Sequence, residues 1–308
     1  MLLALLVVGL LVWQSCGGGG GEAASTISET ADGGTATAAE SALEIQALLA
    51  TTDLGLGPNR ISFLLLTPDG LITVPEVQVS SQYLSGGGSS SEPAETATAR
   101  FHLWPFGTRG NYVTQLSFDG PGAWELDVKV YNLDGTIDTT RIHLEVKEVT
   151  ATPALGSAPP LVENKTLDDI DSFEELTAWP RPDPELYQLT IPEAVASGKP
   201  LVVVFSSPGF CTSPTCGPQV DTVQELKGLY REQANFIHVE VYDNPIDIQQ
   251  DLKKGRYHPA VTAWGLPDIE GYLNESWVFI LDKSGRIAYK YEGYASIDEL
   301  EKGLKSVF

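Results

Sequence analysis

The sequence predicts an all-β segment over residues 42–150 and an α/β segment over residues 185–308. Three observations lead to this division. Short runs rich in β-branched and aromatic residues, separated by turn residues, fill the first segment. The second segment alternates patterns of buried strands with patterns of capped helices. Between them, residues 151–184 are rich in proline and acidic residues, so we expect a linker there.

The first 16 residues carry the pattern of an export signal. The apolar run Leu2–Trp13 is too short to span a bilayer but is typical of a secretory signal. Cys16 and a run of glycines follow it, an arrangement that resembles a bacterial lipoprotein signal. The resemblance implies that Cys16 is lipidated. A signal peptide cut elsewhere, or an uncleaved signal anchor, is the alternative.

Both interpretations place the remaining chain outside the cytoplasm. We expect it to be attached to the cell membrane through a lipid or a signal anchor and to face the extracytoplasmic side. Residues 17–41 are rich in Gly, Ala, Ser and Thr and show no apolar periodicity, so we expect a disordered spacer. The chain has 41 acidic and 19 basic residues. Such a surface repels phosphate backbones, which argues against nucleic-acid binding.

Evenly spaced strand patterns fill residues 42–150. Ile61–Leu66 ends in the turn residues 67–70, and apolar residues alternate with polar ones over Trp124–Val130 and again over Arg141–Val146. Because no helical pattern interrupts these strands, we expect an antiparallel β-sandwich of immunoglobulin-like type. This segment contains no cysteine, so packing alone must hold it together.

The C-terminal segment has a mixed pattern. Thr190 and Glu193 form a capping box that begins a short helix, and Ser296 and Glu299 begin the last one. Leu201–Phe205 is a continuous apolar run, typical of a strand buried on both faces. The other expected elements are a helix over 218–231, a strand over 236–242, a helix over 246–254 and a hairpin over 277–291.

The cysteine pair carries the chemistry. Cys211 and Cys216 lie between the buried strand and the helix that follows it. A helix N-terminus stabilises a thiolate through its free amide groups and partial positive charge. Because the thiolate is the species that attacks disulfides, this position suits thiol–disulfide exchange.

The segment Phe-Cys-Thr-Ser-Pro-Thr-Cys-Gly-Pro at 210–218 resembles the active-site region of extracytoplasmic thioredoxin-like proteins. With Trp-Gly-Leu-Pro at 264–267, the whole chain is similar to bacterial membrane-attached proteins with a β-sandwich before a thioredoxin-like domain. The resemblance implies a thioredoxin-like fold over residues 185–308 and a protein thiol or disulfide as partner. It also implies that Cys211 is the nucleophile and Cys216 the resolving thiol.

The chain departs from that pattern at two places. Thioredoxins have two residues between their cysteines, whereas four lie between Cys211 and Cys216. Ser276 occupies the position of the proline that thioredoxins carry before the hairpin strand. A peroxidase of the peroxiredoxin type is excluded because Pro208 stands where such enzymes carry Thr or Ser.

The alternative function is a non-catalytic binding or assembly protein. Its cysteines form a static disulfide, or a metal clip such as the Cu(I) site of a Sco-type chaperone, with His258 as a further ligand. We expect His258 to lie in a surface turn, which favours the oxidoreductase, and that interpretation requires no cofactor and no bound metal.

Glu240 interrupts an apolar strand of the C-terminal segment. If it is buried beneath the cysteines, its carboxylate is a candidate proton relay between them. The alternative is a strand-end glutamate that faces solvent or pairs with a Lys or Arg.

Overall fold

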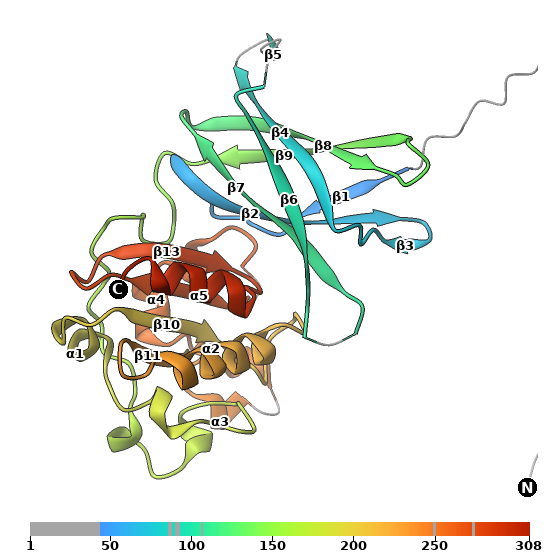
Figure 1. Cartoon of the computed structure of the whole chain (residues 1–308). Coiled ribbons are helices and arrows are strands. Elements are labelled where there is room, and N and C mark those ends of the chain that lie inside the picture. Colours follow the sequence, from blue (N-terminus) through green and yellow to red (C-terminus); the bar gives the residue numbers. More distant parts are fainter. Residues whose placement is uncertain (1–43, 86–87, 90–92, 106, 249–250, 273–274) are drawn as a thin grey trace, which may run out of the picture. The chain divides into compact units, whose positions relative to one another are not determined.

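The computed structural model describes residues 44–85, 88–89, 93–105, 107–248, 251–272 and 275–308 (Figure 1). The predicted signal, Cys16 and the spacer lie outside these residues. Contacts gather Ala42–Phe308 into one compact unit. Within the described part of the chain, every helix is too short or too polar to cross a bilayer.

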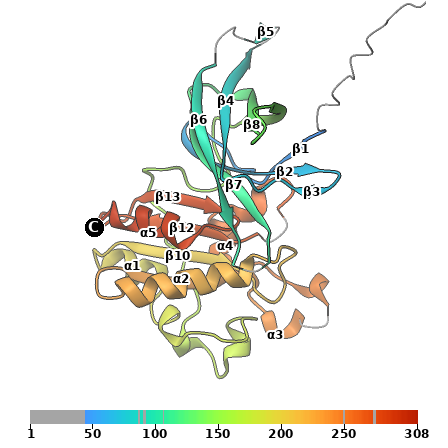
Figure 2. The same ribbon diagram turned by 45° about the vertical axis from the view of Figure 1, so that its right-hand side comes forward.

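The N-terminal strands form a single sheet. Among the described residues it has nine strands, all paired antiparallel, in the order β1-β2-β7-β6-β4-β8-β9, with β3 added to β2 and β5 to β4 (Figures 1 and 2). The strands are β1 (Gln46–Leu49), β2 (Gly57–Thr67), β3 (Gly70–Leu71), β4 (Glu76–Ser85), β5 (Gly88–Ser89), β6 (Glu95–Leu103), β7 (Gly110–Phe118), β8 (Gly122–Tyr131) and β9 (Ile137–Val146).

This sheet curls until its two ends meet. The Thr140 hydroxyl of β9 donates to the Ile45 carbonyl at 2.8 Å, and the Lys147 amide donates to the Leu54 carbonyl at 2.9 Å. The sheet is therefore nearly closed and barrel-like. Its interior is filled by apolar side chains from all its long strands, among them Phe63, Tyr112, Trp124 and Leu126.

The C-terminal sheet has four strands in the order β11-β10-β12-β13 among the described residues. Its strands are β10 (Leu201–Ser206), β11 (Asn235–Glu240), β12 (Trp277–Leu281) and β13 (Ile287–Glu292). The helices are α1 (Ile191–Ala196), α2 (Cys216–Tyr230), α3 (Pro245–Ile248), α4 (Pro259–Ala263) and α5 (Ile297–Lys305). Strand β10 pairs parallel with β11 and antiparallel with β12.

Two apolar clusters cover the faces of this sheet. Val202 and Val204 of β10 pack with α2 and α5, whereas Leu201, Val203 and Phe205 pack with α1 and α4. Strand β10 is thus buried on both faces, as its continuous apolar run predicts. Figure 2 shows α2 running along β10.

The predicted fold class is wrong. We expected an α/β thioredoxin-like domain preceded by an all-β immunoglobulin-like sandwich of two sheets. The described chain is instead mostly β, its helices are few, and the N-terminal strands form the one nearly closed, barrel-like sheet. The alternation of apolar and polar residues is the same in a sandwich and in a barrel, because both bury one face of each strand.

Several local predictions are confirmed. Both capping boxes are present, at Thr190 with Glu193 and at Ser296 with Glu299. The hairpin of β12 and β13 turns at residues 282–285. The helix expected over 246–254 is reduced to α3 and a 3-10 turn, Leu252–Lys254, within the described residues.

Residues 151–184, expected to be a linker, pack on the C-terminal sheet and its helices. The Gly156 amide donates to the Ile287 carbonyl at 2.7 Å, and the Trp264 indole donates to the Pro160 carbonyl at 3.2 Å. Two 3-10 turns, Leu167–Asp169 and Phe173–Glu175, lie in this stretch, and a third, Pro184–Leu186, begins at its end.

Arg60 of β2 joins the barrel-like sheet to the C-terminal helix. Its Nε lies 2.8 Å from Glu299 Oε1, and its other nitrogens donate to the carbonyls of Glu292 and Tyr294. The side chain of Arg60 is 5% exposed and that of Glu299 is 14% exposed. Both charges are therefore largely removed from water and depend on each other.

We predict that Arg60→Ala lowers the free energy of unfolding by about 3 kcal/mol, because it leaves the largely buried Glu299 carboxylate without its arginine partner. The control is Arg141→Ala, whose side chain is 65% exposed beside Asp127 and which we expect to cost less than about 1 kcal/mol. Urea denaturation of both variants measures the difference. Equal losses of stability in the two variants would show that the buried Arg60–Glu299 pair contributes no more than an exposed ion pair.

Candidate functional site

Cys211 and Cys216 are joined by a disulfide, with their Cα atoms 6.3 Å apart. The cysteine loop, residues 207–215, connects β10 to α2. It begins with a tight turn, in which the amides of Phe210 and Cys211 both donate to the Ser207 carbonyl. The structure therefore brings together the two residues that the sequence singled out.

The two sulfur-bearing residues differ in exposure. Cys216 is 1% exposed and is the first residue of α2, where the Ser206 hydroxyl donates to its carbonyl at 3.0 Å. Cys211 is only partly buried. A reacting thiol can therefore reach Cys211 more readily than Cys216, while the helix N-terminus stabilises a thiolate on Cys216.

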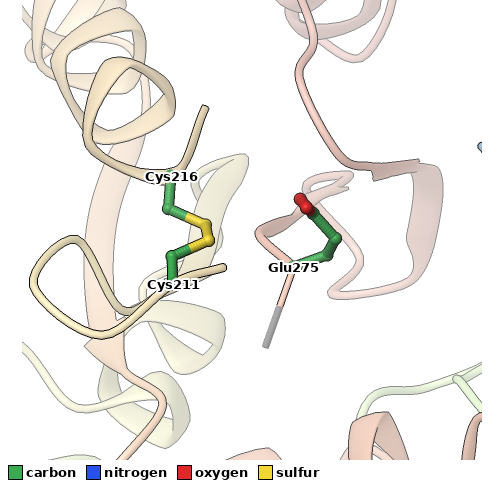
Figure 3. A group of neighbouring side chains, drawn as sticks. All are labelled: Cys211, Cys216 and Glu275. Carbon is green, nitrogen blue, oxygen red and sulfur yellow. A yellow bond between two sulfur atoms is a disulfide. The ribbon is translucent and has the colours of Figure 1, made fainter. Parts of the chain in front are cut away.

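A third residue, Glu275, completes this group, and sequence reasoning missed it. One ligand atom from each of Cys211, Cys216 and Glu275 lies within 4.8 Å of the other two. Figure 3 shows the Glu275 carboxylate, on a separate loop, turned toward the disulfide. The pairing of Phe205 with Trp277 in the two antiparallel strands explains this position, because the residues just after β10 then lie beside those just before β12.

Hydroxyl groups of the cysteine loop hold the Glu275 carboxylate. Burial raises the pKa of Glu275, and hydrogen bonds from the side chains of Ser213 and Thr215 partly oppose that rise. The same two hydroxyls lie 2.6 Å from each other. The loop hydroxyls and the carboxylate therefore form one polar network beside the disulfide.

Glu240, the predicted proton relay, ends β11 beside Ser206 of β10 and is 3% exposed. Its carboxylate accepts from the Thr177 hydroxyl at 3.2 Å, the Ala178 amide at 2.9 Å and the Val241 amide at 3.1 Å. The alternative of a solvent-facing glutamate is thus wrong. Burial raises the pKa of Glu240 to about 7 despite these bonds. Its role as a relay stays a prediction.

Two of the partners of Glu240, Thr177 and Ala178, belong to a segment that packs on the cysteine loop, the strap Thr177–Trp179. A Cβ placed on Gly209 would lie 2.6 Å from the Ala178 Cβ, and one on Gly217 would lie 2.6 Å from the Trp179 ring. Glycine at these two positions therefore lets the strap approach the disulfide-bearing loop and the first turn of α2. Glu240 holds the strap, and the strap supports the loop.

The histidines occupy other environments. His258 is buried, not in the expected surface turn, and its Nδ1 accepts from the Ala260 amide at the start of α4. Within the described residues it is not part of the ligand group around the cysteines. His238 lies between the Tyr187 hydroxyl and the Ser206 carbonyl, at 2.6 and 3.1 Å. Burial lowers the pKa of both histidines to about 4, so both are neutral at pH 7.

Phe210, which directly precedes Cys211, packs edge-on against Tyr242 with ring centroids 5.9 Å apart. Tyr242 in turn stacks on Tyr257 at 5.7 Å. An aromatic surface, with Tyr257 40% exposed, therefore adjoins the more accessible cysteine.

The chain has structural neighbours of low similarity among known proteins. No family model matches the chain, and no curated protein matches it. A thiol:disulfide interchange protein of the thioredoxin family from Chlorobium tepidum TLS is a structural neighbour, at 17% identity and a TM-score of 0.33, covering 50% of this chain and 98% of that one. A β-glucosidase from Listeria innocua in complex with gluconolactone is a second structural neighbour, at 13% identity and a TM-score of 0.19. The match covers 34% of this chain and 16% of that one. Similarities this low establish neither a family nor an activity.

Gly217→Ala tests the packing of the strap. We expect it to lower the free energy of unfolding by roughly 1–3 kcal/mol, because the new methyl group meets the Trp179 ring. Gly228→Ala is the matched control in the same helix, with open space around it, and should raise stability by roughly 0.5–1 kcal/mol. Thermal unfolding measures both, and a stabilising Gly217→Ala would contradict this packing.

Glu240→Gln tests the buried carboxyl. A carboxyl whose pKa is higher in the folded chain binds more protons there, so its contribution to stability falls as pH rises from 4.5 toward 7. We expect the free energy of unfolding of the wild type, relative to Glu240→Gln, to fall by roughly 2–3 kcal/mol between about pH 5 and pH 8. The exposed Glu270→Gln should show no such trend. A pH-independent difference for Glu240→Gln would refute the raised pKa.

Proposed function

We propose that the chain is an extracytoplasmic thiol–disulfide oxidoreductase that acts on protein disulfides through Cys211 and Cys216. The observation that carries the proposal is the unequal exposure of one disulfide at the start of a helix, with Cys211 accessible and Cys216 buried. Exchange requires one sulfur that an external sulfur can reach and a second that waits behind it. A purely structural bond has no need of this asymmetry.

The reaction starts from the reduced pair. The Cys211 thiolate attacks one sulfur of a protein disulfide, a mixed disulfide forms, and the other substrate sulfur leaves as a thiolate that takes up a proton. Cys216 then loses its proton and attacks Cys211 Sγ, so the substrate leaves as a dithiol. The pair has supplied two electrons and is now the disulfide seen here. An external dithiol reductant restores it.

The helix N-terminus supports the second step. Cys216 must become a thiolate in a buried place, which desolvation opposes. As the first residue of α2 it lies at the positive end of the helix dipole, which favours the thiolate. The export signal and the lipid anchor on Cys16 form part of the proposal, on the basis of the sequence pattern of residues 2–21.

Two serine variants of the full chain, both in a Cys16→Ser background, provide the test. After reduction, Cys216→Ser should form a stable mixed disulfide with a model protein that carries one exposed disulfide, because the resolving thiol is missing. Cys211→Ser should react at least about tenfold more slowly, since its only thiol is buried. Mass spectrometry after alkylation measures both rates.

Equal rates for the two variants would contradict the assignment of Cys211 as the nucleophile and Cys216 as the resolving thiol. If the native disulfide resists strong reductant, the bond is static and the proposal fails.

A further inference from the structure

The Glu275 carboxylate raises a question that disulfide exchange leaves open. It lies beside two sulfurs and is held by the hydroxyls of Ser213 and Thr215, so no cation neutralises it through these bonds. Its two neighbours are neutral only while they form the disulfide or carry protons. Two thiolates added to this carboxylate would place three negative charges within a few ångströms of one another.

We propose that the reduced chain binds one Zn²⁺ ion through Cys211 Sγ, Cys216 Sγ and a carboxylate oxygen of Glu275. The inference rests on the proposed function only in that the disulfide must open under mild reduction. The three ligand atoms already lie within 4.8 Å of one another in the disulfide form, and opening the bond lets the two sulfurs move apart to the separation that two zinc ligands need. Figure 3 shows the carboxylate and the disulfide facing each other.

The ligand set selects the ion. Thiolates exclude Mg²⁺ and Ca²⁺, which take oxygen ligands, whereas Cu(I) is satisfied by soft sulfur ligands and gains little from a carboxylate. Zn²⁺ accepts both sulfur and carboxylate oxygen in a tetrahedral arrangement. Three protein ligands leave a fourth position, and the partial exposure of Cys211 leaves room for water there.

Three local features support the site. The ligands come from three places in the fold: Cys216 begins α2, Cys211 belongs to the cysteine loop before it, and Glu275 lies two residues before the buried strand β12. Ser213 and Thr215 hold the carboxylate, as hydrogen-bonding neighbours commonly orient a metal ligand. A divalent cation also neutralises two of the three charges that the reduced group collects.

Binding of this kind is coupled to the redox state. A dithiol reductant supplies two electrons and two protons to the Cys211–Cys216 bond and leaves as its own disulfide. Zn²⁺ then displaces the two thiol protons. Because the disulfide form lacks thiolate ligands, the ion stabilises only the reduced pair and makes its oxidation less favourable. Zinc is therefore expected to hold the pair in its reduced state.

The test uses the full chain in a Cys16→Ser background, reduced and freed of reductant without oxygen. Calorimetric titration with Zn²⁺ as the only added metal should show one ion per reduced chain and none per oxidised chain. Competition with a chromophoric chelator measures the affinity. Glu275→Gln should weaken binding at least about tenfold, whereas the exposed Glu270→Gln should bind like the parent. Substitution by Co²⁺ should give a thiolate charge-transfer band in the parent.

Alkylation of Glu275→Gln under the same conditions checks that its two thiols are present, and thermal unfolding checks that its fold is intact. Unchanged Zn²⁺ affinity in that variant, or tight binding of Cu(I) without Zn²⁺ binding, overturns the inference. If the Cys216→Ser chain traps the model disulfide but the reduced parent binds no Zn²⁺, the zinc site fails and the oxidoreductase stands. A disulfide that resists reduction would contradict both the zinc site and the oxidoreductase activity.

Discussion

The antiparallel pairing of β10 with β12 is the constraint on which the site depends. It sets Phe205 opposite Trp277, so the chain leaving β10 and the chain entering β12 meet at one edge of the sheet. The cysteine loop and Glu275 are far apart in sequence but are the immediate continuations of these two strands. A shift of register by one residue would turn every buried side chain of β12 to the opposite face, so the core that fixes the register also fixes the site.

Opposing electrostatic effects meet at the disulfide. The positive end of α2 favours a thiolate on Cys216, and the Glu275 carboxylate disfavours one on either sulfur. Beneath the loop, a second carboxylate, Glu240, is neutral or charged near pH 7 according to how well the strap satisfies it. Glu275 and Glu240 are the same residue type, so their surroundings decide how each carboxylate affects the charge near the disulfide.

Patterns confined to a few residues were predicted well. The capping boxes at Thr190 and Ser296, the buried strand β10 and the hairpin of β12 and β13 each follow from a local rule of spacing or side-chain chemistry. The closure of the N-terminal sheet was not predictable in this way, because it depends on where the first and last strands meet. Period-two alternation contains no information about that contact.

The candidate site, like the fold, was predictable only where its residues are close in sequence. Cys211 and Cys216 were evident because they are close in sequence at a strand–helix junction, whereas Glu275 joins them only through strand pairing. The burial of His258 was missed for a similar reason. A histidine beside a proline in a loop gives no sign that its ring caps α4 and is covered by the surrounding chain.

The Glu299 carboxylate closes the capping box of α5 and also binds Arg60 of β2. The start of the last helix and the middle of an early strand thus share one carboxylate. During synthesis Arg60 emerges long before Glu299, so the barrel-like sheet cannot complete this contact while the C-terminal residues are still being made. A fragment that stops before α5 would leave the Arg60 guanidinium without its carboxylate counter-ion, so this early strand gains the contribution of the ion pair only in a chain that includes its last helix.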